Sequence, residues 1–208
     1  GANAVYANKQ SDGTYAIFGE KWFCSNANAD LILMTARYDA EIEGTPGLGL
    51  FLVPRCLDDG SPNHYAIRRL KDKIGTRAMA SAEIEFNGAV AYAVDPVEEG
   101  FKTVMTDVLH LSRLFNTFTV LGMGRRAHQI AYQYARHRCA FGQPIIQYPL
   151  VMKHLVTVRV ENTALCAGIF ATTALQDQHD TAHEVKEDGS LLLRLLANLN
   201  KSVSALWS

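Results

Sequence analysis

Hydrophobic and polar residues alternate in short runs over residues 1–96, and Gly, Asp, Asn and Pro separate the runs. Within the runs, β-branched and aromatic residues predominate, which is typical of antiparallel strands that bury one face. Ser11-Asp12-Gly13 predicts a hairpin turn before one of them. The predicted strands span residues 15–18, 21–25, 31–36, 48–53, 65–70, 82–86 and 90–94.

The period of the pattern changes after Asp95-Pro96, where apolar residues begin to recur at intervals of three and four. This spacing predicts amphipathic helices over 98–138, 150–176 and from 190 to the end, with a polar loop over 177–189. At about 1.5 Å per residue the first helix is roughly 60 Å long, which favours a bundle. The predicted fold is α+β: an antiparallel β-barrel or sandwich domain over 1–96, then an up-down helical bundle over 97–208.

Charge is balanced overall but unevenly distributed. The chain has 20 Lys and Arg against 21 Asp and Glu, so no whole-chain field attracts nucleic acid or an anionic membrane. Residues 111–160, however, contain basic residues and no acid. These cations steer an anionic cofactor or a CoA tail, contact a polynucleotide, or simply form a solvated helix face or pair with acids elsewhere. They are Arg113, Arg125, Arg126, Arg136, Arg138, Lys153 and Arg159.

Several common classes of site lack support in the sequence. The four cysteines are widely spaced, which favours reduced thiols in a cytosol or an organelle matrix, and the histidines lack the partners of a metal site. No Gly-x-Gly-x-x-Gly or phosphate-loop motif is present. No apolar run approaches the ~20 residues of a membrane helix, so no membrane association is expected. The chain lacks an initiator Met and ends within an apolar helical pattern, so we expect a fragment.

Three short stretches carry a resemblance when they are read in order: Lys21-Trp22-Phe23-Cys24-Ser25 with Ala29-Asp30, then 71–77 (KDKIGTR), then 138–142 (RCAFG). Together, across the change from strands to helices, they resemble the acyl-CoA dehydrogenase family. The wording of 69–73 (RLKDK) and 146–150 (IQYPL) is most similar to its DNA-alkylation-response branch. This resemblance implies that an N-terminal helical domain and the C-terminal end of the bundle are absent from the chain.

The resemblance implies FAD as cofactor and assigns it residues in both halves of the chain. In the β half, Trp22 supplies an apolar face for the flavin ring, with Cys24 and Ser25 beside it. Family members usually have Thr or Ser where Cys24 stands. The alternative interpretation is that Trp22 fills the β core.

In the helical half, the resemblance gives Arg138 to the dinucleotide pyrophosphate of a neighbouring subunit and Phe141 to packing beside the cofactor. Gln147 is a substitute for a cofactor-contacting glutamine that many relatives have at the position of Pro149. The alternative for Arg138 is a helix C-terminal cation that the macrodipole stabilises.

For the substrate, the resemblance implies an acyl-CoA and assigns Arg113 to its site. Removal of the α-proton requires a carboxylate, which family members place either immediately before the arginine matching Arg113 or farther downstream. This chain has Ser112 at the first place, so no catalytic base is assigned.

The leading hypothesis is therefore an FAD-dependent acyl-CoA dehydrogenase that forms a homodimer or homotetramer in the cytoplasm or the mitochondrial matrix, with an electron acceptor that the sequence does not identify. One alternative is a flavin-containing protein that protects DNA through regions outside this chain. The other is a non-catalytic module that keeps the fold.

Overall fold

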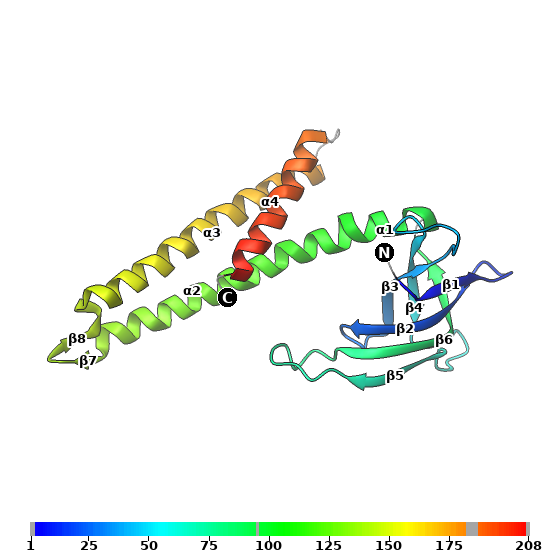
Figure 1. Ribbon diagram of the computed structural model, residues 1–208, viewed down its shortest axis with the longest axis horizontal. Coiled ribbons are helices and arrows are strands. Elements are labelled where there is room, and N and C mark those ends of the chain that lie inside the picture. The colour runs from blue at the N-terminus through cyan, green and yellow to red at the C-terminus, as the bar shows by residue number, and fades with distance from the viewer. Residues whose placement is uncertain (1–2, 95, 182–186, 207–208) are drawn as a thin grey trace. The chain divides into compact units, whose positions relative to one another are not determined.

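The computed structural model describes residues 3–94, 96–181 and 187–206 (Figure 1). The backbone forms two compact units, Gly1–Thr106 and Asp107–Ser208. The first contains the main sheet and the second contains the long helices, so the α+β class predicted from the sequence is confirmed. The division lies C-terminal to the boundary predicted after residue 96.

The first unit is a small antiparallel barrel. Its strands are ordered β2-β1-β3-β4-β6-β5, and an additional pairing of β2 with β6 closes the sheet on itself. Only β1 and β3 pair in parallel among the described strands, through Tyr6 and Arg37. Closure leaves one inner face for a single core. The strands are β1 (Tyr6–Lys9), β2 (Tyr15–Cys24), β3 (Leu31–Arg37), β4 (Leu48–Pro54), β5 (Tyr65–Leu70) and β6 (Ala82–Ala93).

The barrel core follows from the alternation along these strands. In β2, Tyr15 and Ile17 are buried, and in β6 every inward position from Ala82 to Ala91 is buried. The predicted hairpin turn is confirmed, because β1 and β2 pair antiparallel and Asp12 Oδ1 accepts hydrogen bonds from the Thr14 backbone and hydroxyl. The turn carboxylate thus fixes the register of the first pair.

The start of the helical region belongs to the barrel unit. The short helices η1 (Val97–Glu99) and α1 (Gly100–Thr103) pack against β4. This packing is possible because two glycines face each other: a Cβ on Gly100 would collide with the Leu50 backbone, and one on Gly49 would press on the Val97 side chain. The close approach explains why the units divide after Thr106.

The second unit is built on three helices: α2 (Leu109–His137), α3 (Pro149–Thr181) and α4 (Glu187–Leu206). A π-helical turn, η2 (Val104–Val108), leads into α2. Each of the three helices contacts the other two, as Figure 1 shows for α4 lying along α2 and α3. A hairpin of β7 (Cys139–Ala140) and β8 (Gln143–Pro144), then the short helix η3 (Ile145–Gln147), connects α2 to α3. No described helix is both long and apolar enough to cross a membrane.

Apolar and polar contacts hold the helices together. Leu121, Leu165 and Ile169 form the apolar cluster between α2 and α3. On α4, Asn200 Nδ2 donates to Thr172 Oγ1 of α3 at 2.7 Å. On α2, His110 Nε2 donates to Gln176 Oε1 of α3 at 2.7 Å, which gives this buried histidine a structural contact.

Three predictions of element bounds were wrong. Strands predicted as pairs, 15–18 with 21–25 and 82–86 with 90–94, are the continuous strands β2 and β6. The helix predicted over 98–138 is interrupted by η2. The loop predicted over 177–189 is shorter, because α3 continues to Thr181 and α4 begins at Glu187; residues 182–186 lie outside the described part of the chain. Strand β1 was not predicted.

Candidate functional site

A cavity of about 360 Å³ opens beside the C-terminal end of β2. Its walls are mostly apolar and come from β2, β3 and β6, with Leu31, Met34 and Phe86 among them. Its polar groups come from β2, the segment after it and β3, and they belong to Lys21, Cys24, Ser25, Asn26 and Thr35. The cavity therefore combines an apolar wall with a few polar groups, which is the usual composition of a small-molecule site.

A β-bulge determines which residues of β2 face this cavity. Lys21 pairs with Ile84 of β6 and Cys24 pairs with Ala82, so β2 has one extra residue between these two pairs. Ile84 and Ala82 are both buried in the barrel. Because cross-strand partners lie on the same face of a sheet, Lys21 and Cys24 both face the interior, although residues three apart on a regular strand face opposite sides.

Burial shapes the chemistry of these two groups. It lowers the pKa of Lys21 from its ordinary value and raises the pKa of Cys24, since in each case burial disfavours the charged form. The Cys24 thiol donates weakly to the Lys21 carbonyl at 3.9 Å. Cys24 is therefore a protonated thiol at neutral pH and not a nucleophilic thiolate.

Trp22 and Phe23 lie next to the cavity but differ in their surroundings. Trp22 is 62% exposed, which excludes the interpretation that it fills the β core. The Lys71 ammonium lies 3.3 Å from the centroid of the Trp22 ring, and the Arg69 guanidinium lies 5.4 Å from it. Phe23 is 61% exposed and lines the cavity, whereas Trp22 does not. The sequence did not indicate this position of Phe23, because the bulge between Lys21 and Cys24 breaks the regular alternation of inward and outward residues.

Glu83 anchors the two cations beside Trp22. Its buried carboxylate on β6 accepts a short hydrogen bond from Lys71 Nζ and a 2.8 Å bond from Arg69 Nε. The hydrogen bond from Lys71 is the main cause that lowers the pKa of Glu83, and Arg69 adds to the effect. Two cations share one acid here, so this face is locally electropositive next to exposed aromatic rings.

The connection between α2 and α3 presents the second set of predicted residues. Phe141 and Gly142 form the two-residue loop of the β7–β8 hairpin, with φ of +52° and +88°. Both residues have the positive φ that a type I′ turn requires. Phe141 is 98% exposed, so a bulky residue is held in a strained backbone conformation with its ring in solvent. Strain and exposure together mark it as a functional candidate.

Neighbouring residues fix this hairpin. The Tyr148 hydroxyl donates to the Ala140 carbonyl at 2.7 Å, and the Tyr148 ring packs edge-on to that of Phe141. Arg138 caps α2 with an extended backbone, and its carbonyl accepts a bond from the Ile145 amide. The Arg138 side chain is exposed and makes no hydrogen bond or ion pair with the described residues. The side chain of Gln147 in η3 is likewise exposed and makes no such bond with them. The hairpin thus brings Arg138, Phe141 and Gln147 onto one short segment.

Arg113 and Ser112 lie on α2, distant in sequence from the hairpin. Arg113 is half-buried and Ser112 is exposed. Trp22, Cys24 and Ser25 belong to the barrel unit, and Arg113, Arg138, Phe141 and Gln147 belong to the helical unit. The structure describes each of these two sets of residues within its own unit. A single FAD site formed by both sets, which the resemblance implies, stays a prediction.

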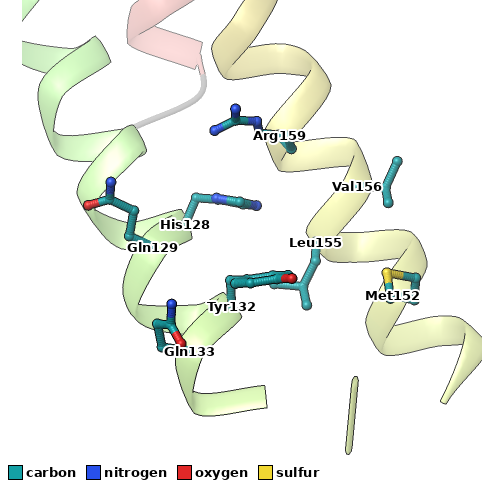
Figure 2. Close-up of a pocket in the computed structure, with 8 residues that line it drawn as sticks. All are labelled: His128, Gln129, Tyr132, Gln133, Met152, Leu155, Val156 and Arg159. Atoms are coloured by element: carbon teal, nitrogen blue, oxygen red, sulfur yellow. The ribbon is translucent and has the colours of Figure 1, made fainter. Parts of the chain in front are cut away.

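A second cavity, of about 330 Å³, lies between α2 and α3 (Figure 2). Figure 2 shows Tyr132 of α2 and Leu155 of α3 meeting in it, with His128 and Arg159 toward one end. No acid lines this cavity among the residues described there. Across the described ranges, no group of three or more His, Cys, Asp or Glu is placed to hold a metal ion, and all four cysteines are free.

Two domain models of one family match successive parts of the chain. Residues 1–89 match the acyl-CoA dehydrogenase middle domain, and residues 98–198 match the acyl-CoA dehydrogenase C-terminal domain. The chain belongs to the acyl-CoA dehydrogenase family. The family resemblance inferred from the three stretches is thereby confirmed, and the branch stays a prediction.

Individual relatives agree with this assignment. The protein described as putative acyl-CoA dehydrogenase AidB of Escherichia coli is 32% identical over 183 residues, which cover 88% of this chain and 32% of AidB. The crystal structure of Caenorhabditis elegans ACDH-11 in complex with C11-CoA superposes with a TM-score of 0.87 at 28% identity, over 98% of this chain and 35% of that one. This acyl-CoA dehydrogenase family chain spans about a third of the length of these relatives.

A more distant member shares the fold. The structure of an acyl-CoA dehydrogenase from Bacillus anthracis complexed with FAD has a TM-score of 0.80 at 20% identity, over 97% of this chain and 35% of that one. This neighbour supports the barrel-and-bundle architecture of the acyl-CoA dehydrogenases for the chain.

Proposed function

We propose that this chain is the middle and C-terminal part of an FAD-dependent acyl-CoA dehydrogenase, which oxidises an acyl-CoA thioester to the 2,3-enoyl-CoA. The chemistry that FAD supplies in such a reaction is acceptance of a hydride at its N5 atom. The observation that carries the proposal is the β7–β8 hairpin, which holds Phe141 98% exposed at positive φ beside Arg138, whose side chain has no partner among the described residues.

The donor set of the chain fits this cofactor. Flavin rings bind against apolar and aromatic faces. The exposed Phe23, which lines the cavity of the barrel unit, and the exposed Trp22 next to it in β2 offer such faces. The diphosphate of a dinucleotide binds best to a guanidinium, which donates two parallel hydrogen bonds. The Arg138 guanidinium is exposed and binds no described residue, which supports this role. Lys71 and Arg69, which share a single carboxylate, favour an anionic ligand near Trp22.

The remaining roles follow from the same proposal. Cys24 stands where a hydroxyl is usual in the family, so the backbone and Ser25 provide the hydrogen bonds near the ring edge. Arg113 binds the CoA moiety, and Gln147 assists Arg138. Arg138 and Phe141 serve the flavin of a neighbouring subunit in a homodimer or homotetramer. No acid lies between residues 111 and 160, so the α-proton passes to a base outside this segment.

The test is an absorbance spectrum of the full-length protein, before and after anaerobic addition of a panel of short and branched acyl-CoAs. We expect a flavin band near ~450 nm that at least one of them bleaches, because the reducing equivalents pass to the cofactor. A band that none of them bleaches would favour the DNA-protecting or the non-catalytic alternative. A protein without flavin would contradict the cofactor assignment itself.

A further inference from the structure

Lys21 occupies an unusual position in the barrel cavity. It is half-buried and faces inward, paired with the buried Ile84 in the regular alternation of β2, just before the bulge. Over the described part of the chain, its amine makes no hydrogen bond and no ion pair. The contrast with Lys71, which is bound to the Glu83 carboxylate, shows that the barrel provides a partner for one lysine and not for the other.

The walls around Lys21 suit an apolar acyl chain. Leu31, Ile32 and Met34 of β3 and Phe86 of β6 line a cavity of about 360 Å³, and no carboxylate lines it. Asn26 adds a side-chain amide at the same cavity, whose two N–H groups can donate hydrogen bonds to a carbonyl oxygen. An apolar pocket, two donors and one amine form the minimal site for an acyl transfer to nitrogen.

We propose that Lys21 is an acyl-acceptor site, at which the amine takes an acyl group from a short-chain acyl thioester bound in the barrel cavity. The Nζ lone pair attacks the thioester carbonyl carbon, an amide C–N bond forms, and the C–S bond breaks. The thiol of CoA leaves with the proton that the nitrogen releases, so no oxidant or further reactant is required. The proposal rests on the proposed function only for the presence of an acyl-CoA.

Two properties of the cavity support this assignment of the nucleophile. Only the neutral amine attacks a thioester, and burial, which lowers the pKa of Lys21, enlarges that neutral fraction at a given pH. Cys24 is the other titratable group among the residues described at the cavity, and burial raises the pKa of its thiol. The competing nucleophile is therefore held in its unreactive form.

The experiment measures acylation at each lysine of the full chain. The protein is incubated with butyryl-CoA and, separately, with the butyryl thioester of N-acetylcysteamine, which lacks the nucleotide. Peptide mass spectrometry then gives the initial rate of butyrylation at Lys21 and at the exposed Lys9 and Lys201. We expect Lys21 to react at least about fivefold faster than either, because only Lys21 among the three lines a cavity that holds the thioester beside its amine. Equal or slower labelling at Lys21 would overturn the proposal.

Two controls identify the bond and the residue. An amide survives neutral hydroxylamine, whereas a thioester on Cys24 is cleaved, so a hydroxylamine-labile label would also overturn the proposal. Lys21→Arg removes the site, and the matched Lys9→Arg leaves labelling of Lys21 unchanged. Should Lys21→Arg fail to fold, the comparison of lysines within the wild-type chain still decides the outcome. The pH profile adds a further check: labelling of Lys21 levels off below the ordinary pKa of a lysine side chain, because burial lowers the pKa of Lys21.

Failure of this proposal is distinguishable from failure of the dehydrogenase assignment. Acylation is read as mass on Lys21 and requires no flavin, whereas dehydrogenation is read as bleaching of the flavin band. Bleaching without labelling contradicts the acyl-acceptor site alone. Labelling without bleaching contradicts the dehydrogenase alone.

Discussion

At the scale of single residues, the polar cluster beside Trp22 depends on one carboxylate. Glu83 is buried on β6 and binds both Lys71 and Arg69. Lys71 is only 11% exposed, so loss of Glu83 leaves an ammonium largely shielded from water without its counter-ion. The same lysine lies on the Trp22 ring, and the carboxylate thereby also holds the aromatic platform in place.

We expect Glu83→Gln to lower the melting temperature by several degrees at pH 7. The pKa of Glu83 is depressed below its ordinary value of 4.5, so its stabilising contribution is complete above pH 4.5 and disappears as the pH falls through the folded-state pKa. Thermal melts of both proteins from pH 7 to pH 3 should therefore converge in acid. The control is Glu85→Gln on the same strand, whose carboxylate is 57% exposed. A gap that persists unchanged at low pH would contradict the assignment.

A substitution at Phe141 is expected to change stability and flavin binding in opposite directions. Asn adopts positive φ more readily than Phe, so Phe141→Asn should stabilise the helical unit by roughly 1 kcal/mol. The same change removes the exposed ring, and we expect the full-length protein to lose flavin more readily on dialysis. Chemical unfolding and the ratio of flavin to protein absorbance measure the two effects. Flavin retention equal to that of the wild type would show that the ring does not contact the cofactor.

At the scale of elements, the packing of α1 on β4 sets the beginning of the helical region. Gly100 lies against the Leu50 backbone, which cannot move aside as a flexible side chain would. This contact places the start of the chain's helical region on the barrel rather than on the bundle. The stability of the barrel unit should therefore be sensitive to the size of this one residue.

Gly100→Ala is expected to destabilise the barrel unit by about 1–3 kcal/mol, the usual cost of overpacking. The matched control is Gly122→Ala in α2, where an added Cβ meets no atom of the described chain. That control should gain up to about 1 kcal/mol from helix propensity. Denaturant unfolding curves of the two variants test both signs, and a neutral result for Gly100→Ala would show that β4 and α1 can separate without cost.

The elements that the sequence predicted well are those with a clear apolar period. The presence of α3 and α4 and the positions of β3 to β5 follow from that period. Two strands were divided wrongly because Gly19 and Gly88 look like breaks, yet the strands continue through them with positive φ. The π-helical turn η2 was not predicted, because its sequence contains no Gly or Pro that would indicate an interruption of the helix.

In the candidate site, too, the sequence predicted some residues and not others. Motif residues such as Arg138 and Phe141 were identified by family resemblance, and the structure adds their exposure and their shared hairpin. Phe23 was not assigned, because it lies within a bulge and bulges leave no reliable sequence pattern. Lys21 was not assigned, because a lysine is not expected on the inward face of a strand. The sequence also did not identify Glu83. Its partners Arg69, on β5, and Lys71, in the loop after β5, meet it only when the strands pair.

At the scale of the whole molecule, the cationic segment 111–160 is the part of the chain for which anion binding is predicted. Its Arg125, Arg126, Arg136, Lys153 and Arg159 are exposed, as is Arg138, and none forms an ion pair with the described residues. Pairing with acids elsewhere in the chain is therefore not observed for them. A solvated face and a contact with an anionic ligand remain the two interpretations, and they differ in what substitution does.

Arg138→Lys should weaken FAD binding about tenfold, because an ammonium replaces the two parallel donors of a guanidinium. The matched Arg126→Lys, on the exposed face of α2, should leave FAD binding unchanged. Flavin titration of the apoprotein gives both affinities, and light scattering checks that the oligomer is intact. Equal affinities for the two variants would assign Arg138 to capping of α2 alone.

Closure of the barrel also dictates an order of events during synthesis. Tyr15 near the start of the barrel unit pairs with Ala91 near its end, so the last strand must be available before the ring can close. Pairings this distant in sequence fold slowly, whereas the helical unit is held by more local contacts. During synthesis on the ribosome, β1 to β5 emerge before β6, so the edges of β2 and β4 that pair with β6 stay unpaired until β6 is made. The barrel is therefore most exposed to aggregation before its final strand arrives, and slower translation through residues 82–93 would lengthen that interval.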